Sequence, residues 1–162
     1  MVTDLNHNTI KAAIGTLLRA DTSIYDQSGG SNKLRSILVG YPPGGDPLQD
    51  TSANFAFITN NTTLESNRPV GVTVSNVIQA LEHTVRYDIT FVMQDETPRK
   101  TEVIMDTIQQ GIMQTLTENH DLTANVDDSY PERVEALKPI NTQGKTKQAR
   151  KITLKCIVTT GD

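Results

Sequence analysis

The sequence predicts an α+β domain in which a mixed, mostly antiparallel sheet carries two amphipathic helices packed on one face. Residues 81–94 alternate apolar and polar side chains, which is typical of a long strand with one face in the core. Residues 4–18 and 98–116 repeat apolar side chains at three- and four-residue steps, as amphipathic helices do. A chain of 162 residues has the size of one domain, so residues 1–162 are expected to fold as a unit.

The first helix is expected over residues 4–18. Its apolar side chains line one helix face, and they are Leu5, Ile10, Ala13, Ile14, Leu17 and Leu18. Residues 21–32 follow with Asp, Ser and two adjacent glycines, a composition that predicts a loop. Residues 34–41 are rich in β-branched and aromatic side chains and stop at two prolines, which predicts a first strand.

A second, short strand is expected over residues 54–59. Polar, turn-forming segments lie on both sides of it and predict long loops at about 42–53 and 60–77. Compact domains rarely keep two such loops without a use, so both are candidate binding surfaces. In the long strand that follows, the core-facing positions are Leu81, His83, Val85, Tyr87, Ile89, Phe91 and Met93. The opposite face of this strand is expected to meet water or a partner.

The second helix is expected to begin with Thr97 as its cap and Pro98 at its first position. Its apolar residues recur every four positions and predict the cover of the long strand; they are Ile104, Ile108, Ile112 and Leu116. Strands at 133–140 and 150–160 are expected to form a hairpin. Its turn, residues 141–148, contains Gly144, which is free to adopt a positive φ.

The composition excludes several classes of protein. A net charge of −4 does not favour direct nucleic-acid binding. The basic residues at 145–151 are expected to be an ordinary hairpin end rather than a phosphate site. The N-terminus lacks the basic and apolar parts of a secretory signal, and no apolar run approaches the roughly 20 residues that span a bilayer. The sequence therefore predicts synthesis in the cytosol and no membrane insertion.

No residues predict a catalytic, cofactor or metal site. His7, His83 and His120 fall in different predicted elements without an acid or second ligand at a recognised spacing. His83 lies in the core register and is expected to be hydrogen bonded near the end of the sheet. Cys156, the single cysteine, also falls in a core register and is expected to be inert.

Two further motifs do not carry a site. The run Gly144-Lys145-Thr146 matches the end of a phosphate-binding loop, but Pro139 stands where the loop needs its first glycine. The acid pairs at 95–96 and 127–128 are expected to be solvated loop residues.

The layout of the chain resembles a known family. The segments that carry the resemblance are RSILVGYPPGGDP, HTVRYDITFVMQ, TPRKTEVIMDTIQQGIMQTLTENHDL and the final hairpin. Their order is similar to that of the tail terminator, or tail-completion, proteins of long-tailed bacteriophages. The resemblance implies a virion protein, assembled in the host cytoplasm, that forms a hexameric ring. That ring caps the tail-tube protein, meets the head connector or neck proteins, and lets DNA pass through its lumen without sequence-specific binding.

Interface residues are expected on the polar face of the long strand and in the two long loops. They are Arg86, Asp88, Thr90, Pro43, Asp46, Asp50, Asn60 and Arg68. One alternative is another neck or head-completion protein, or a tail-tube subunit, which would also assemble but touch other partners. A more distant alternative is a small enzyme or ligand-binding domain with a cleft converging on His83 or Cys156.

Overall fold

The computed structural model describes residues 4–28, 32–42, 54–72, 78–95, 97–142 and 145–161. Two helices and six strands occur in these residues, and their order along the chain is α1 (His7–Ala20), β1 (Ser36–Val39), β2 (Phe55–Val72), β3 (Ile78–Asp95), α2 (Pro98–Glu118), β4 (Asp128–Ala136), β5 (Ile140–Thr142) and β6 (Lys145–Gly161). The predicted α+β class with a mixed, mostly antiparallel sheet is confirmed.

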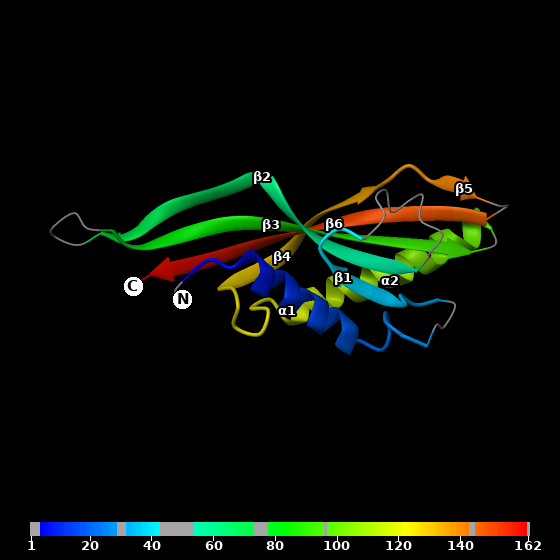
Figure 1. The fold of residues 1–162 in the computed structure, drawn as a ribbon, viewed down its shortest axis with the longest axis horizontal. Helices are drawn as coiled ribbons and strands as arrows, with labels where there is room; N and C mark the ends of the chain where they lie inside the picture. Colours follow the sequence, from blue (N-terminus) through cyan, green and yellow to red (C-terminus); the bar gives the residue numbers. More distant parts are fainter. Residues whose placement is uncertain are drawn as a thin grey trace.

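The sheet has the strand order β1-β2-β3-β6-β4, and β5 also pairs with β6. β1 is parallel to β2, whereas every other pair is antiparallel. The three central strands have 17 or 18 residues each, and at 3.3–3.4 Å per residue they span about 60 Å. The sheet is therefore much longer than either helix that accompanies it (Figure 1).

Both helices begin at side-chain caps. The Asn6 side chain accepts a 3.1 Å hydrogen bond from the Thr9 backbone N–H at the start of α1. Thr97 accepts one of 3.2 Å from the Lys100 N–H at the start of α2, where Pro98 occupies the first turn. These caps satisfy N–H groups that have no partner inside the helix. The predicted start of the second helix is confirmed.

The main hydrophobic core lies between the helices and one face of the sheet. Its buried members include Ile14 and Leu18 of α1, Ile108 and Ile112 of α2, and Ile89 of β3. The alternation predicted the core-facing side chains of β3 correctly from Val85 to Met93. It was wrong for Leu81, which is 36% exposed, and for His83, which is half-buried, because β3 continues past the helices at this end. In Figure 1 the helices lie under one part of the sheet, and the central strands continue past them.

The sequence prediction was wrong about the length of the second strand. β2 does not end near Thr59 but continues to Val72, so residues 60–72 are strand rather than loop. Residues 73–77 lie outside the described residues. The polar side chains of this stretch gave no apolar alternation, but its backbone pairs with β3 from Ser66 opposite Thr84 to Val72 opposite Ile78. An irregularity between Asn61 and Ser66 interrupts the register, which also hides the strand pattern.

Other boundaries differ as well. The predicted loop at 42–53 lies outside the described residues except for Pro42. β4 begins at Asp128, within the predicted loop. The connection from α2 to β4 is short and contains a turn with left-handed backbone at residues 122–124. β5 and the start of β6 occupy most of the predicted 141–148 turn, and Gly144 is outside the described residues.

Candidate interaction surface

The central strands extend beyond the helices as a three-stranded ribbon, which we call the arm: residues 66–72 of β2, 78–84 of β3 and 157–161 of β6. The three segments lie side by side in Figure 1, at the end of the molecule away from β5. Among side chains whose exposure is described in the arm, Val158 alone is buried. An ordered ribbon that buries so little leaves most of its side chains for contact with water or another molecule.

The edges of the arm carry features that discourage further strand pairing. Among the described residues, β3 is the one sheet neighbour of the β2 segment, and this edge contains Pro69 and an exposed Arg68–Glu82 ion pair of 2.7 Å. On the β6 side, the Asp127 carboxylate accepts a 2.6 Å hydrogen bond from the Thr159 N–H. Proline and charge are typical of edges kept free of strand addition. The arm is therefore suited to contacts through side chains.

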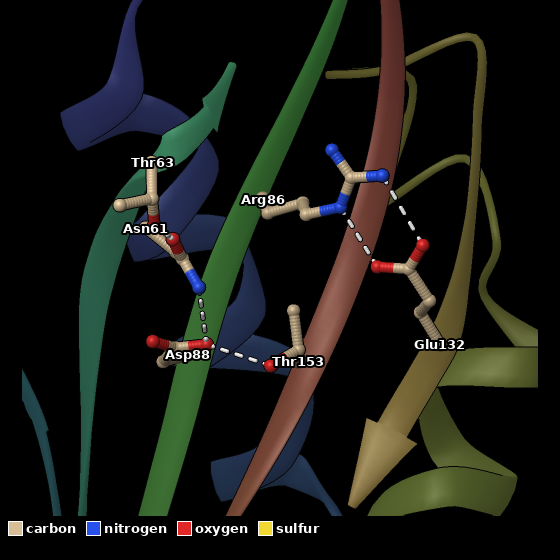
Figure 2. Close-up of polar contacts among 6 residues, drawn as sticks. All are labelled: Asn61, Thr63, Arg86, Asp88, Glu132 and Thr153. Carbon is tan, nitrogen blue, oxygen red and sulfur yellow. Dashed lines mark hydrogen bonds and ion pairs between the residues drawn. The ribbon is translucent and has the colours of Figure 1, made fainter.

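At the base of the arm, the outer face of the sheet, which is the face opposite the helices, is ordered by an ion pair. Arg86 of β3 reaches across β6 and donates to both carboxylate oxygens of Glu132, at 2.7 and 3.1 Å (Figure 2). The hydrogen bond from Arg86 lowers the pKa of Glu132 below its ordinary value. Such a bidentate geometry fixes both side chains. Arg86, a predicted interface residue, is thus held by its own chain.

Next to this pair, Asp88 and Thr90 are not open to a partner. Their residues are 9% and 5% exposed. Asp88 accepts a 2.8 Å hydrogen bond from Thr153 and a longer one, 3.4 Å, from the Asn61 amide (Figure 2). The prediction that these two residues face water or a partner is wrong, because this part of the outer face is covered and adjoins a second apolar cluster formed by Phe55, Phe57, Val92 and Ala149.

The other predicted interface residues have different positions. Arg68 is exposed on the arm, paired with Glu82. Asn60 lies opposite Tyr87 on the helix-facing side, and its buried Oδ1 has no hydrogen-bond partner in the described part of the chain. Pro43, Asp46 and Asp50 lie outside the described residues. The structure therefore brings Arg86, Asp88 and Thr90 together on one face and places Arg68 apart from them.

A polar cluster that the sequence did not reveal joins α1 to the base of the arm. His7 Nδ1 lies 2.8 Å from the Tyr87 hydroxyl, and its Nε2 lies 3.6 Å from a carboxylate oxygen of Glu65. Burial raises the pKa of Tyr87, so this phenol stays protonated. The residues come from three elements and are far apart in the chain, and no spacing in the sequence connects them.

The side chains considered for chemistry have structural roles. His83 Nε2 lies 2.9 Å from the Thr160 hydroxyl, which confirms the prediction of a hydrogen-bonded histidine near the end of the sheet. Cys156 is buried, and burial raises its thiol pKa to about 12, so little of it is the reactive thiolate. A surface hollow of about 450 Å³ lies between the C-terminal ends of α1 and α2 and is lined by Asp21 and Thr115, among others. Neither His83 nor Cys156 lines this hollow.

Two of the basic residues near the hairpin end, Arg150 and Lys151, do not form a patch together. Arg150 donates to Asp106 at 2.6 Å and to Gln109 at 2.8 Å, both on α2. Lys151 lies 3.3 Å from Glu135 of β4. Because these two cations point to opposite faces of the sheet and meet acceptors of their own chain, they do not present a joint surface to phosphate.

Within the described ranges, no group of three or more His, Cys, Asp or Glu residues is arranged to hold a metal ion. Neither described helix is long and apolar enough to cross a membrane. In comparisons with known proteins, no protein-family model matches the chain and no curated protein matches it significantly.

Proposed function

We propose that this chain is a structural virion protein that forms a ring at the head-proximal end of a phage tail, where it caps the tail tube and joins it to the head connector. The observation that carries the proposal is the arm. Three strands continue past the helices (Figure 1), and among their side chains of described exposure Val158 alone is buried. The assignment to a phage tail comes from the resemblance in element order to tail terminator proteins.

The arm is difficult to explain by folding alone. Ordering each residue costs about 1–2 kcal/mol in backbone entropy, and apolar burial, the main favourable contribution, is small in a ribbon in which Val158 alone is buried among the side chains of described exposure. An extended ribbon that buries so little therefore gains its use from a neighbouring molecule. In a ring, each subunit offers different surfaces to its two neighbours, and a projecting arm supplies one such surface.

The charge of the chain fits a DNA passage. A net charge of −4 gives the whole molecule a weakly repulsive field toward phosphate. A ring lumen that attracted DNA strongly would slow its transit, whereas a mildly acidic one does not retain it. The net charge of −4 is therefore compatible with a conduit for DNA.

The assembly is tested by native mass spectrometry together with electron microscopy of the purified chain. We expect discrete closed rings, with a six-fold ring as the form implied by the resemblance. Long tubes formed by the chain alone would instead identify a tail-tube subunit, and a chain that stays monomeric at all concentrations would contradict the proposal.

Capping is tested with the tube subunit encoded by the same virus. Added rings should limit the length of growing tubes and decorate one tube end in micrographs. Rings that leave the length distribution unchanged and never appear at tube ends would point to another neck or head-completion role.

A further inference from the structure

β2 departs from regular pairing at the level where the arm begins. The nearest registered pairs with β3 are Asn61–Arg86 and Ser66–Thr84, so four residues of β2 lie opposite one residue of β3. We call these four residues, 62–65, the β2 bulge. β3 and β6 pass the same level without a break in their pairing. Because a bulge bends its strand and increases the local twist, the direction of the arm is decided at the β2 bulge.

The outer side of the β2 bulge is anchored to the sheet. The Thr63 hydroxyl donates a hydrogen bond to Oδ1 of Asn61, and the Asn61 amide donates to Asp88 at 3.4 Å (Figure 2). Asp88 in turn accepts the 2.8 Å hydrogen bond from Thr153. Polar contacts within the chain therefore hold this side of the bulge.

The other side of the β2 bulge meets the first turn of α1. Glu65 Oε1 lies 3.6 Å from Nε2 of His7, the first residue of α1, and His7 Nδ1 lies 2.8 Å from the Tyr87 hydroxyl. The His7 and Tyr87 rings also meet edge to face, with centroids 5.8 Å apart. When the Tyr87 hydroxyl donates to Nδ1, a neutral His7 carries its own proton on Nε2, the nitrogen that faces Glu65. The contacts thus link the bulge, the helix and β3.

The charge of Glu65 suits its place beside α1. The N-terminal end of a helix carries partial positive charge, and the first turn of α1 contains no acidic residue of its own. Glu65 brings a carboxylate to that end from a different element. Its side chain is 32% exposed, so a substitution there does not open the core.

We infer that Glu65 and His7 tether the β2 bulge to α1 and thereby set the direction in which the arm leaves the sheet. The inference rests on the proposed ring for its consequence, because an arm held in one direction presents the same surface to each neighbouring subunit. Such pre-organisation reduces the ordering cost of binding. Without the tether, the three strands of the arm stay paired but sample several directions.

The tether is tested by a distance measurement in the dissociated subunit. Spin labels on Asn67→Cys in the arm and on Gln110→Cys in α2, both exposed positions, report the direction of the arm relative to the helices. The native Cys156 is buried and does not take up label. The otherwise unmodified chain should give one narrow distance distribution.

Reversing the two charges singly and then together isolates the tether. Glu65→Lys puts a cation at the positive end of α1, and His7→Glu puts a second carboxylate beside Glu65, so each should broaden the distribution. The double variant His7→Glu/Glu65→Lys restores opposite charges and keeps an acceptor for the Tyr87 hydroxyl, so it should recover the narrow distribution. Glu102→Lys, at an exposed position of α2, is the matched control for net charge and should leave the distribution narrow.

Two results would overturn the tether: an unchanged distribution in Glu65→Lys, or a double variant as broad as the single variants. Circular dichroism checks that each variant keeps the fold. If a variant at His7 does not fold, the comparison of Glu65→Lys with Glu102→Lys decides the question, because both positions are exposed.

Ring formation separates this inference from the proposed function. Glu65→Lys should weaken ring assembly by about fivefold, the factor expected for loss of one partly exposed ion pair, and the double variant should restore it. Rings that form equally well in Glu65→Lys despite a broadened arm would overturn the role of the tether in assembly and leave the ring. A chain that forms no ring would contradict the proposed function, whereas the distance measurement would still decide whether the tether exists.

Discussion

Gly111 illustrates how one residue controls the packing of α2 against the segment after α1. A Cβ atom at this position would lie 2.2 Å from Cγ2 of Ile24, a core side chain that is 1% exposed. We expect Gly111→Ala to destabilise the fold by about 1–3 kcal/mol through overpacking, despite the better helix propensity of alanine. Gly15→Ala is the matched control in α1, since its Cβ meets the flexible end of Arg19 at 3.4 Å. Urea unfolding of both variants measures the difference, and equal stabilities would show that Ile24 yields.

The Arg86–Glu132 pair gives a prediction about pH. The folded-state pKa of Glu132 is lowered by Arg86, so the pair stabilises the fold above the unfolded pKa of about 4.3. This stabilisation is lost as the pH falls through the lower, folded pKa. Because both side chains are partly exposed, Glu132→Gln should cost no more than about 1 kcal/mol at pH 7. Thermal unfolding between pH 7 and pH 3 should show this difference shrinking; a constant difference would exclude the ionised pair as its cause.

Individual residues were predictable where alternation alone decided their position. Cys156 was assigned to the core from the register of its strand and is buried there. His83 was assigned to the same face, but it is half-buried in the arm, where it contacts Thr160. Asp88 was assigned to an open face by the same rule, but it is buried. Alternation identifies which face a residue points to, whereas what covers that face depends on residues far away in the chain.

At the scale of elements, helices were easier to predict than polar strands. Thr97, Pro98 and an apolar repeat of four residues predict α2, and all three signals are local in the sequence. The outer part of β2 has no such signal, because its order comes from backbone pairing with β3. The sequence indicates the bulge near Pro131 in β4 only weakly, through the proline itself, because proline inside a strand is typical of an edge or a bulge. The Glu132 that this bulge presents to Arg86 could not be inferred without the register.

The cap of α2 permits a direct test at this scale. Thr97→Ala removes the acceptor for the Lys100 N–H and should destabilise the fold by about 1 kcal/mol. Thr107→Ala is the control within the same helix, because Thr107 is exposed and its hydroxyl donates only to the Val103 carbonyl. That change should be neutral or slightly stabilising, since alanine is the better helix former. Guanidinium unfolding should rank the variants in this order, and a reversed order would mean that the cap contributes nothing.

For the whole molecule, the decisive contrast is between the covered sheet and the arm. Amide hydrogen exchange follows local opening, which is easy where little apolar surface is buried. In the dissociated subunit, obtained by dilution, residues 78–84 of β3 should exchange much faster than residues 87–93 of the same strand, whose side chains are buried. Assembly should slow exchange in residues 78–84 by about tenfold or more and leave residues 87–93 nearly unchanged. Exchange in the arm that is the same before and after assembly would remove the arm from the subunit contacts, and with it the main structural support for a ring-forming virion protein.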